Sequence, residues 1–189
     1  MPRAGLTRQR VVAEAGVLAD ESGLARLTMA ELAQRLGVRL PSLYKHVDGM
    51  DGLQRDLAIS AKTELAEVLA RSAVGKSREQ AITSMCHACR SWATAHPGRY
   101  SATVRAAAPG DSEDEAAGAA VVAIVLDVLS GFGLSGDDAI DAVRVVRASL
   151  HGFISLESDR GFGLPNDVDR SFDRLVAATC RSLAADGRT

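Results

Sequence analysis

Apolar residues recur at intervals of three and four along most of the chain, which is the spacing of amphipathic helices. The first stretch runs from about Thr7 to Glu21 and ends at Gly23. Further helical stretches are expected at about 51–72, from 78 to the His-Pro-Gly at 96–98, and at 116–129, 137–157 and 168–185. Aromatic residues make up only 4% of the chain, and Ala, Leu and Val are abundant. The pattern therefore predicts an all-α protein.

Two shorter helical segments stand close together between residues 28 and 47. Thr28 followed by Glu31 is a capping-box pattern, in which each side chain satisfies a backbone N–H at a helix start. Gly37 can adopt the left-handed conformation that closes this helix. Pro41 suits the first position of a second helix, and we expect Leu40 to cap that helix without a side-chain oxygen. The segment predicts two helices joined by a tight turn.

The second of these helices carries polar residues on the face opposite its apolar positions. A solvated surface is the ordinary explanation for such a cluster, but so short a helix must be held by its neighbours and displayed. The segment from Leu24 to His46 has four Lys and Arg against one Glu, although the whole chain has a net charge of -2. Such a patch suits phosphates and base edges. The candidate residues are Arg39, Ser42, Tyr44, Lys45 and His46.

Length and composition narrow the class of protein further. The chain has 189 residues, of which 47% are hydrophobic, enough for one or two compact cores. The N-terminus lacks the apolar core of a signal peptide, and the longest uncharged apolar run, residues 116–126, is too short to cross a bilayer. Three cysteines are an odd number and argue against a disulfide framework. We therefore expect a cytoplasmic protein without a membrane partner.

Cysteine and histidine chemistry offers weaker alternatives. Cys86 and Cys89 have the CxxC spacing of redox and metal sites, but no second pair follows and no strand precedes them. Buried helical thiols are the favoured interpretation, and a thiol-responsive switch remains the alternative. No cofactor or metal is expected. No catalytic motif is present, so an enzyme is not predicted; the rival is a small helical enzyme built around His87, His96 or His151.

The stretch "LTMAELAQRLGVRLPSLYKHVDGMDGL" resembles the TetR family of bacterial transcriptional regulators. Two later stretches, "SWATAHPGRY" and "LHGFISLESDRGFG", look like the regulatory domain of one TetR subgroup. This resemblance implies a three-helix helix-turn-helix DNA-binding domain at residues 1–49. It also implies a helical-bundle domain at 50–189 for regulation, ligand binding and dimerisation. One departure is Met50, where the family commonly has a lysine that contacts phosphate.

The resemblance further implies a homodimeric repressor that leaves a palindromic operator in double-stranded DNA when a small apolar effector binds. Thr28 and Tyr44 would then contact phosphates through their hydroxyls, Lys45 would contact phosphate by charge, and Arg39 and Ser42 would contact base edges. Leu40 and His46 belong to the same surface. Candidate effector contacts are His87, Trp92, Tyr100, Arg105 and His151. Candidate dimer contacts on the last two helices are Leu150, Phe153, Ile154, Phe172 and Val176.

Overall fold

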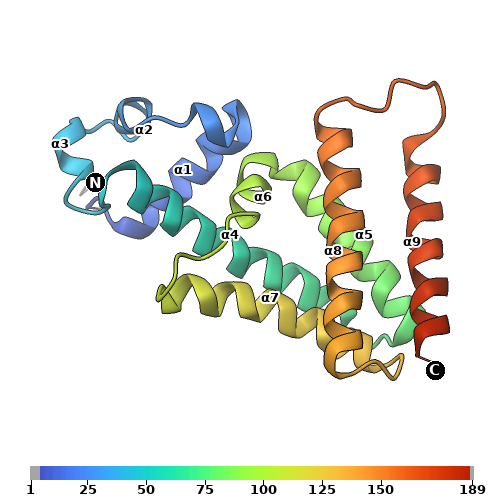
Figure 1. Ribbon diagram of the computed structural model, residues 1–189. Coiled ribbons are helices and arrows are strands. Elements are labelled where there is room, and N and C mark those ends of the chain that lie inside the picture. The colour runs from blue at the N-terminus through green and yellow to red at the C-terminus, as the bar shows by residue number, and fades with distance from the viewer. Residues whose placement is uncertain (1–4, 188–189) are drawn as a thin grey trace. The chain divides into compact units, whose positions relative to one another are not determined.

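The computed structural model describes residues 5–187, and within these it contains nine α-helices, one 3-10 helix and no strand (Figure 1). The all-α prediction is confirmed. None of the helices among the described residues is long and apolar enough to span a membrane. The helices are α1 (Arg8–Ser22), η1 (Leu24–Arg26), α2 (Met29–Arg35), α3 (Leu40–Leu43), α4 (Gly49–Ala73), α5 (Arg78–Ala95), α6 (Pro97–Thr103), α7 (Ser112–Ser130), α8 (Gly136–Ser158) and α9 (Val168–Asp186).

The chain divides into two compact units. Unit 1 comprises the residues up to Glu64 together with Ala95–Gly118, and unit 2 comprises Leu65–Thr94 and the residues from Ala119 onward. Helices α4 and α7 therefore contribute residues to both units. The domain boundary after residue 49 that the sequence indicates stays a prediction.

The core of unit 1 forms around the apolar face of α1. Thr7 caps this helix, because its hydroxyl accepts a hydrogen bond from the backbone N–H of Arg10 at 3.2 Å. The predicted apolar stripe is buried as expected. The buried residues of α1 are Val11, Val12, Ala15, Gly16, Leu18 and Ala19. Leu32 of α2, Leu43 of α3 and Leu53 of α4 are also fully buried, so these helices share one core.

The short segment between α2 and α3 folds as a tight turn. The hydroxyl of Thr28 accepts a hydrogen bond from the N–H of Glu31 at 3.2 Å, which confirms the Thr28 half of the predicted capping box. Gly37 has φ 65°, and the N–H of Val38 donates to the carbonyl of Ala33 at 3.0 Å. The chain thus ends α2 with a left-handed glycine, as the sequence indicated.

The start and the length of α3 differ from the prediction, in which the second helix runs from about Pro41 to Val47. Arg39 caps the helix and Leu40 is its first residue, because the first helical bond runs from the N–H of Ser42 to the carbonyl of Arg39. The predicted cap at Leu40 is therefore wrong, and Pro41 occupies the second position. The helix also ends at Leu43, since the N–H of His46 bonds to the carbonyl of Leu43 and tightens the chain into a turn.

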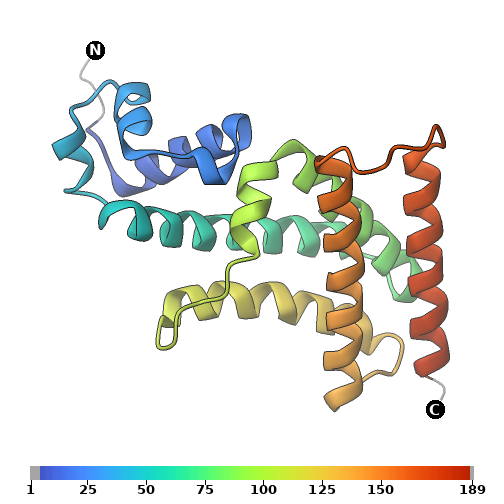
Figure 2. The same cartoon turned by 45° about the horizontal axis from the view of Figure 1, so that its top comes forward.

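Unit 2 has its core among α5, α8 and α9. Helices α8 and α9 lie side by side and antiparallel in both views (Figure 1, Figure 2). Ile82 and Met85 of α5, Ile154 of α8 and Phe172 of α9 are among the most buried side chains. The helix that begins at Arg78 ends at Ala95, because Pro97 starts α6 after a single residue.

Candidate nucleic-acid interface

Helix α3 is held from inside and displays a polar surface outside. Leu43 and Val47 are buried and anchor the helix on the core of unit 1. Tyr44 lies on the opposite side with 55% of its surface exposed. Arg39, Leu40 and Lys45 are also exposed, and Ser42 and His46 are half-buried. Together with Thr28, which is exposed at the start of α2, these residues form what we call the α3 face.

Charge on the α3 face is not neutralised from within the chain. Across residues 5–187, neither Arg39 nor Lys45 forms an ion pair, and Arg26 forms none either. Arg35 behaves differently, because its guanidinium binds Glu14 at 2.8 Å and Glu21 at 2.5 Å. This pairing lowers the pKa of Glu21. Of the four basic residues in the sequence patch, Arg35 is thus structural and the other three remain available to an anion.

The α3 face has the chemistry that reads a nucleic-acid duplex. A helix entering a groove presents base-reading side chains near its N-terminus, and hydroxyls and amines along its edge reach phosphates. Arg39 and Ser42 stand at the N-terminus of α3, while Tyr44 and Lys45 follow its end. The geometry therefore suits both kinds of contact, with apolar residues committed to the core and polar residues left outside.

The five candidate effector contacts occupy different surroundings. Trp92 of α5 is buried, and His151 of α8 is half-buried, both within unit 2. His87 of α5 faces Asp173 at 3.3 Å and packs edge-on against Phe172. Tyr100 and Arg105 belong to unit 1, where Arg105 approaches the carboxylate of Asp114 at 3.9 Å. Their role in an effector pocket stays a prediction.

Unit 2 contains a cluster of a cation and aromatic rings that sequence reasoning missed. The guanidinium of Arg90 lies 4.7 Å from the ring centre of Phe172 and 5.6 Å from that of Phe153. Its Nε donates to Glu157 at 2.8 Å, and its Nη2 lies 2.7 Å from Asp169. Arg90 therefore ties α5 to α8 and α9. The available signal was the position of Arg90 four residues after Cys86, which places both on the same helix face.

The candidate dimer contacts lie mostly inside the single chain. Leu150, Ile154, Phe172 and Val176 are buried, and Phe172 has no exposed surface. Phe153 is half-buried, and its ring packs 4.8 Å from that of Phe162. Residues so buried present little surface to a second copy, because their side chains already fill the core between α8, α9 and α5. Their role in a dimer interface stays a prediction.

The cysteines are buried thiols. Cys86 is 1% exposed and Cys89 is 7% exposed, and Cys180 of α9 is also buried. Burial raises the pKa of Cys86 and that of Cys89 to about 12, because a thiolate is poorly solvated there. Thiols of this kind are unreactive near neutral pH. Within the described part of the chain, no group of three His, Cys, Asp or Glu residues is arranged to hold a metal ion.

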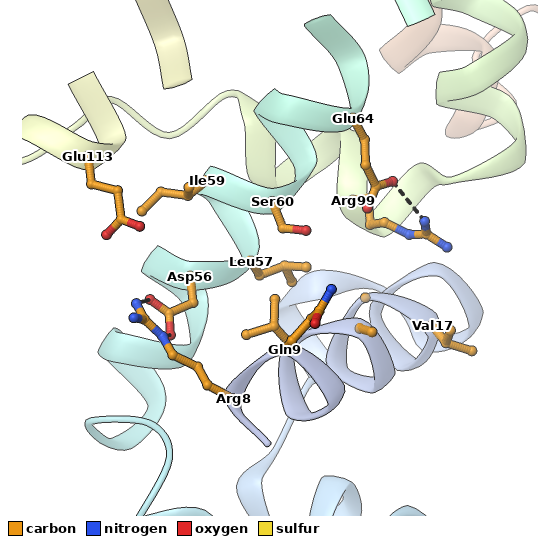
Figure 3. A pocket seen from close by; sticks show the side chains of 13 residues that line it. Arg8, Gln9, Val17, Asp56, Leu57, Ile59, Ser60, Glu64, Arg99 and Glu113 are labelled. Atoms are coloured by element: carbon orange, nitrogen blue, oxygen red, sulfur yellow. Dashed lines mark hydrogen bonds and ion pairs between the residues drawn. The ribbon is translucent and has the colours of Figure 1, made fainter. Parts of the chain in front are cut away.

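A cavity of about 620 Å³ lies in unit 1 between α1 and α4 (Figure 3). Val12, Val17 and Leu57 contribute its apolar walls. Charged residues at its edges are paired with one another: Arg8 with Asp56, and Arg99 with Glu64. None of the five candidate effector contacts lines it.

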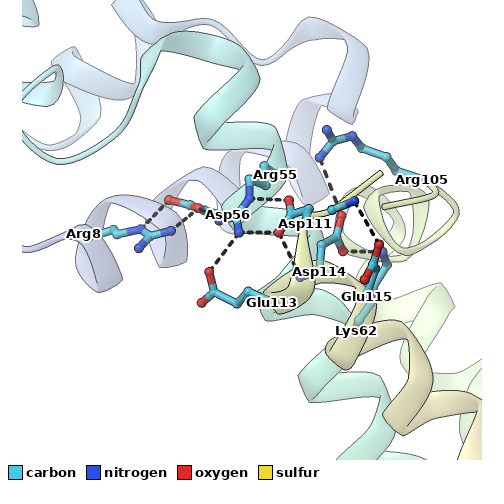
Figure 4. A network of polar contacts seen from close by, with 10 residues as sticks. Arg8, Arg55, Asp56, Lys62, Arg105, Asp111, Glu113, Asp114 and Glu115 are labelled. Atoms are coloured by element: carbon cyan, nitrogen blue, oxygen red, sulfur yellow. Dashed lines mark hydrogen bonds and ion pairs between the residues drawn. The ribbon is translucent and has the colours of Figure 1, made fainter. Parts of the chain in front are cut away.

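Ion pairs also join α4 to the start of α7 (Figure 4). Arg55 donates two hydrogen bonds to Asp111, at 2.5 Å and 2.6 Å, and this pairing lowers the pKa of Asp111 to about 2. Lys62 donates to Asp114 at 2.5 Å, and both of these side chains are buried. The acidic stretch "PGDSEDE", residues 109–115, thus has partners from α4 that only the fold reveals.

Comparison with known proteins agrees with this geometry. Residues 82–179 match the family described as "Tetracyclin repressor-like, C-terminal domain". The chain is 39% identical to Rv0681, an HTH-type transcriptional regulator of Mycobacterium tuberculosis, over 88% of this chain and 75% of the relative. It is 32% identical to YobS, an HTH-type transcriptional regulator of Bacillus subtilis, over 99% of this chain and 97% of the relative.

The fold agrees as well. The TetR family protein ActR of Streptomyces coelicolor, solved in complex with (S)-DNPA, matches 97% of this chain and 99% of its own length with a TM-score of 0.74 at 22% identity. The match to the family covers the C-terminal half, and the relatives extend the likeness across α1 to α3. The chain therefore belongs to the TetR family and is a DNA-binding transcriptional regulator.

Proposed function

We propose that this regulator is a homodimeric repressor that binds a palindromic operator and leaves it when a small apolar effector binds. The observation that carries the proposal is the α3 face, a set of polar side chains without ion-pair partners on a helix whose apolar side is fixed in the core. Apart from Thr28, which caps α2, these side chains form no ion pair among residues 5–187, so their chemistry is available to DNA.

Each residue of the α3 face has a role that follows from its position. Arg39 and Ser42 read base edges, because they stand where a recognition helix enters the major groove. Lys45 neutralises a phosphate, and Thr28 and Tyr44 donate hydroxyl hydrogen bonds to the backbone. Leu40 and His46 complete the contact surface. Sequence specificity then depends chiefly on Arg39, and general affinity on Lys45.

The dimer forms through the outer side of α8 in this proposal. Val145 and Leu156 are 55% and 50% exposed, although both are large apolar residues. Ala148 and Gly152 lie between them on the same exposed side and allow a second helix to approach closely. A second copy related by a two-fold axis would cover this stripe with its own. Two recognition helices would then stand about 34 Å apart, one turn of DNA.

An apolar segment of α7 supports the effector part of the proposal. Val121, Ile124, Val125 and Leu126 belong to unit 2 and are only half-buried. An apolar ligand would cover such residues, and the complex of ActR with (S)-DNPA shows a relative of this fold with a small molecule bound. Release requires that the effector binds one conformation of the dimer more tightly than the other.

The experiment that tests this function is selection of binding sites from random double-stranded DNA by the purified chain, repeated at two salt concentrations. Enrichment of a palindrome with half-sites about one turn apart is the expected result. Two further results would support the proposal: the protein sediments as a dimer, and an apolar compound releases the selected DNA from it. A folded protein that enriches no sequence at either salt concentration would overturn the proposal.

A further inference from the structure

The motif His96-Pro97-Gly98-Arg99 has no part in the α3 face, yet its glycine makes a very close helix contact in unit 1. Gly98 of α6 lies directly against the backbone of α1. A methyl group added at Gly98 would overlap the carbonyl group of Ala19 and lie 2.6 Å from the backbone nitrogen of Asp20. Backbone atoms cannot move aside as a flexible side chain can. Only glycine permits this contact.

Asp20 of α1 fastens the same contact with hydrogen bonds. Its carboxylate accepts from the backbone N–H of Arg99 at 2.9 Å and from the guanidinium Nε of Arg99 at 2.8 Å. The ring nitrogen Nδ1 of His96 lies 3.3 Å from the same carboxylate. The side chain of Asp20 is largely buried. One α1 carboxylate therefore holds the first turn of α6 at three atoms.

Arg99 extends the contact to a third helix. Its Nη1 donates to Glu64 of α4 at 2.9 Å (Figure 3). Its aliphatic part crosses α1 at Gly16, where an added methyl group would meet the arginine Cδ at 3.2 Å. Arg99 thus lies in a groove that a small residue keeps open, with an acidic partner at each end.

Placement of α6 on α1 has a consequence for the α3 face. Helices α2 and α3 share one core with α1, so whatever fixes α1 fixes the α3 face. Helix α6 is continuous with α5 apart from one residue, His96. The contact formed by Gly98, Arg99 and Asp20 therefore attaches α1, and with it the helix-turn-helix, to α6 within unit 1.

We propose that Gly98, Arg99 and Asp20 are positioning residues that set the spacing between the two DNA half-sites which the dimer accepts. This inference rests on the proposed function, because half-site spacing has meaning only for a dimer on an operator. A loosened attachment would leave each α3 face able to read its half-site, while the distance between the two faces would cease to be fixed.

The test compares full-length wild type with Gly98→Ala and Arg99→Gln on operators whose half-sites are moved one or two base pairs closer or further apart. Each base pair shifts one half-site by about 3.4 Å and rotates it by about 35° around the duplex. Wild type is expected to lose affinity about tenfold or more for a one-base-pair change. Both variants are expected to lose less than about threefold, with binding to a single half-site unchanged within about twofold.

Matched variants separate positioning from folding. Gly118→Ala adds the same methyl group to α7, where nothing lies within 4 Å, and is expected to keep the wild-type spacing profile. Arg99→Lys keeps the charge and is expected to restore part of that profile. If Gly98→Ala loses helical content, Arg99→Gln decides the outcome.

The two proposals fail in different ways. A wild-type protein that binds no operator overturns the proposed function. A wild-type protein that binds, together with folded variants that keep its full spacing preference, overturns the positioning role alone.

Discussion

The α3 face and the Arg90 cluster each contain an arginine and an aromatic residue, yet they differ in what the arginine contacts. In the Arg90 cluster, the guanidinium has two carboxylate partners and two aromatic rings from the same chain. On the α3 face, Arg39 and Lys45 have no charged partner among residues 5–187. Satisfied groups hold a fold together, whereas groups left unpaired on a rigid support are available for recognition.

Removal of a large side chain from the Arg90 cluster gives the largest effect on folding. Phe172→Ala is expected to lower the free energy of unfolding by about 3–5 kcal/mol, because the ring is fully buried and leaves a cavity. Urea denaturation measures this change. Operator affinity per folded molecule should stay unchanged. Arg170→Ala, an exposed change on α9, serves as the control and should stay within about 0.5 kcal/mol. If folded Phe172→Ala bound the operator more weakly than wild type, the Arg90 cluster would contribute to DNA recognition as well as to folding.

On the α3 face, the largest expected effect is on sequence discrimination. Arg39→Ala should lower the preference for the selected operator over a base-substituted one by about 1–3 kcal/mol, because a base contact is lost. Thermal stability should change little, since Arg39 forms no ion pair among residues 5–187. Titration of both DNA molecules measures the difference. An equal loss on every sequence would remove the base-reading role from Arg39.

Replacement of Lys45, which follows Tyr44, is expected to lower DNA affinity by a smaller amount that is the same for every DNA sequence. Lys45→Ala should weaken binding to all DNA alike and reduce the slope of log K against log salt by about 1, because one phosphate contact is lost. Binding at several salt concentrations measures the slope. Lys76→Ala removes the same charge outside the α3 face and should leave the slope unchanged. If Lys45→Ala lost affinity for some DNA sequences and not for others, Lys45 would contact a base edge, the role assigned to Arg39.

The smallest effect near neutral pH is expected for the buried thiols. Cys86 and Cys89 have pKa values of about 12 in the fold, against an ordinary value of 9.0, so they stay protonated when the unfolded chain begins to ionise. Their contribution to stability is complete below pH 9 and is lost as pH rises from 9 to about 12. The free energy of unfolding, measured across this pH range, should fall as pH rises. The double variant Cys86→Ala, Cys89→Ala should show a smaller fall. Rapid alkylation of the native protein at pH 8 would instead favour a thiol-responsive regulator.

Periodicity predicted most of the fold, because most of the long helices bury one regular stripe and end close to a glycine or proline. The helix-turn-helix was also predictable, since Thr28 and Gly37 act on their immediate neighbours. Pro41 was misjudged by one position: a proline is accepted at the first or the second residue of a helix, and the pattern alone does not distinguish them.

The sequence alone could not predict which residues far apart in the chain contact one another. Arg35 looked like its basic neighbours until α1 placed Glu14 and Glu21 beside it. Helix α8 has apolar residues on two sides, so periodicity could not tell the side with Ile154, which is buried, from the side with Val145, which is exposed. The predicted effector and dimer residues were chosen by type, and type does not reveal which neighbour a side chain meets.

The lack of ion pairs at Arg39 and Lys45 among the described residues also bears on how regulators of this kind diverge. A substitution at Arg39 or Lys45 breaks no ion pair within residues 5–187, so it costs the fold little while it changes what is bound. Duplicated copies of such a gene can therefore acquire new operators through single changes at these positions. Gly98 offers no such freedom, because every other residue would collide with α1. Within unit 1, therefore, the residues that can vary to change the DNA target differ from the glycine that must stay constant to keep the fold.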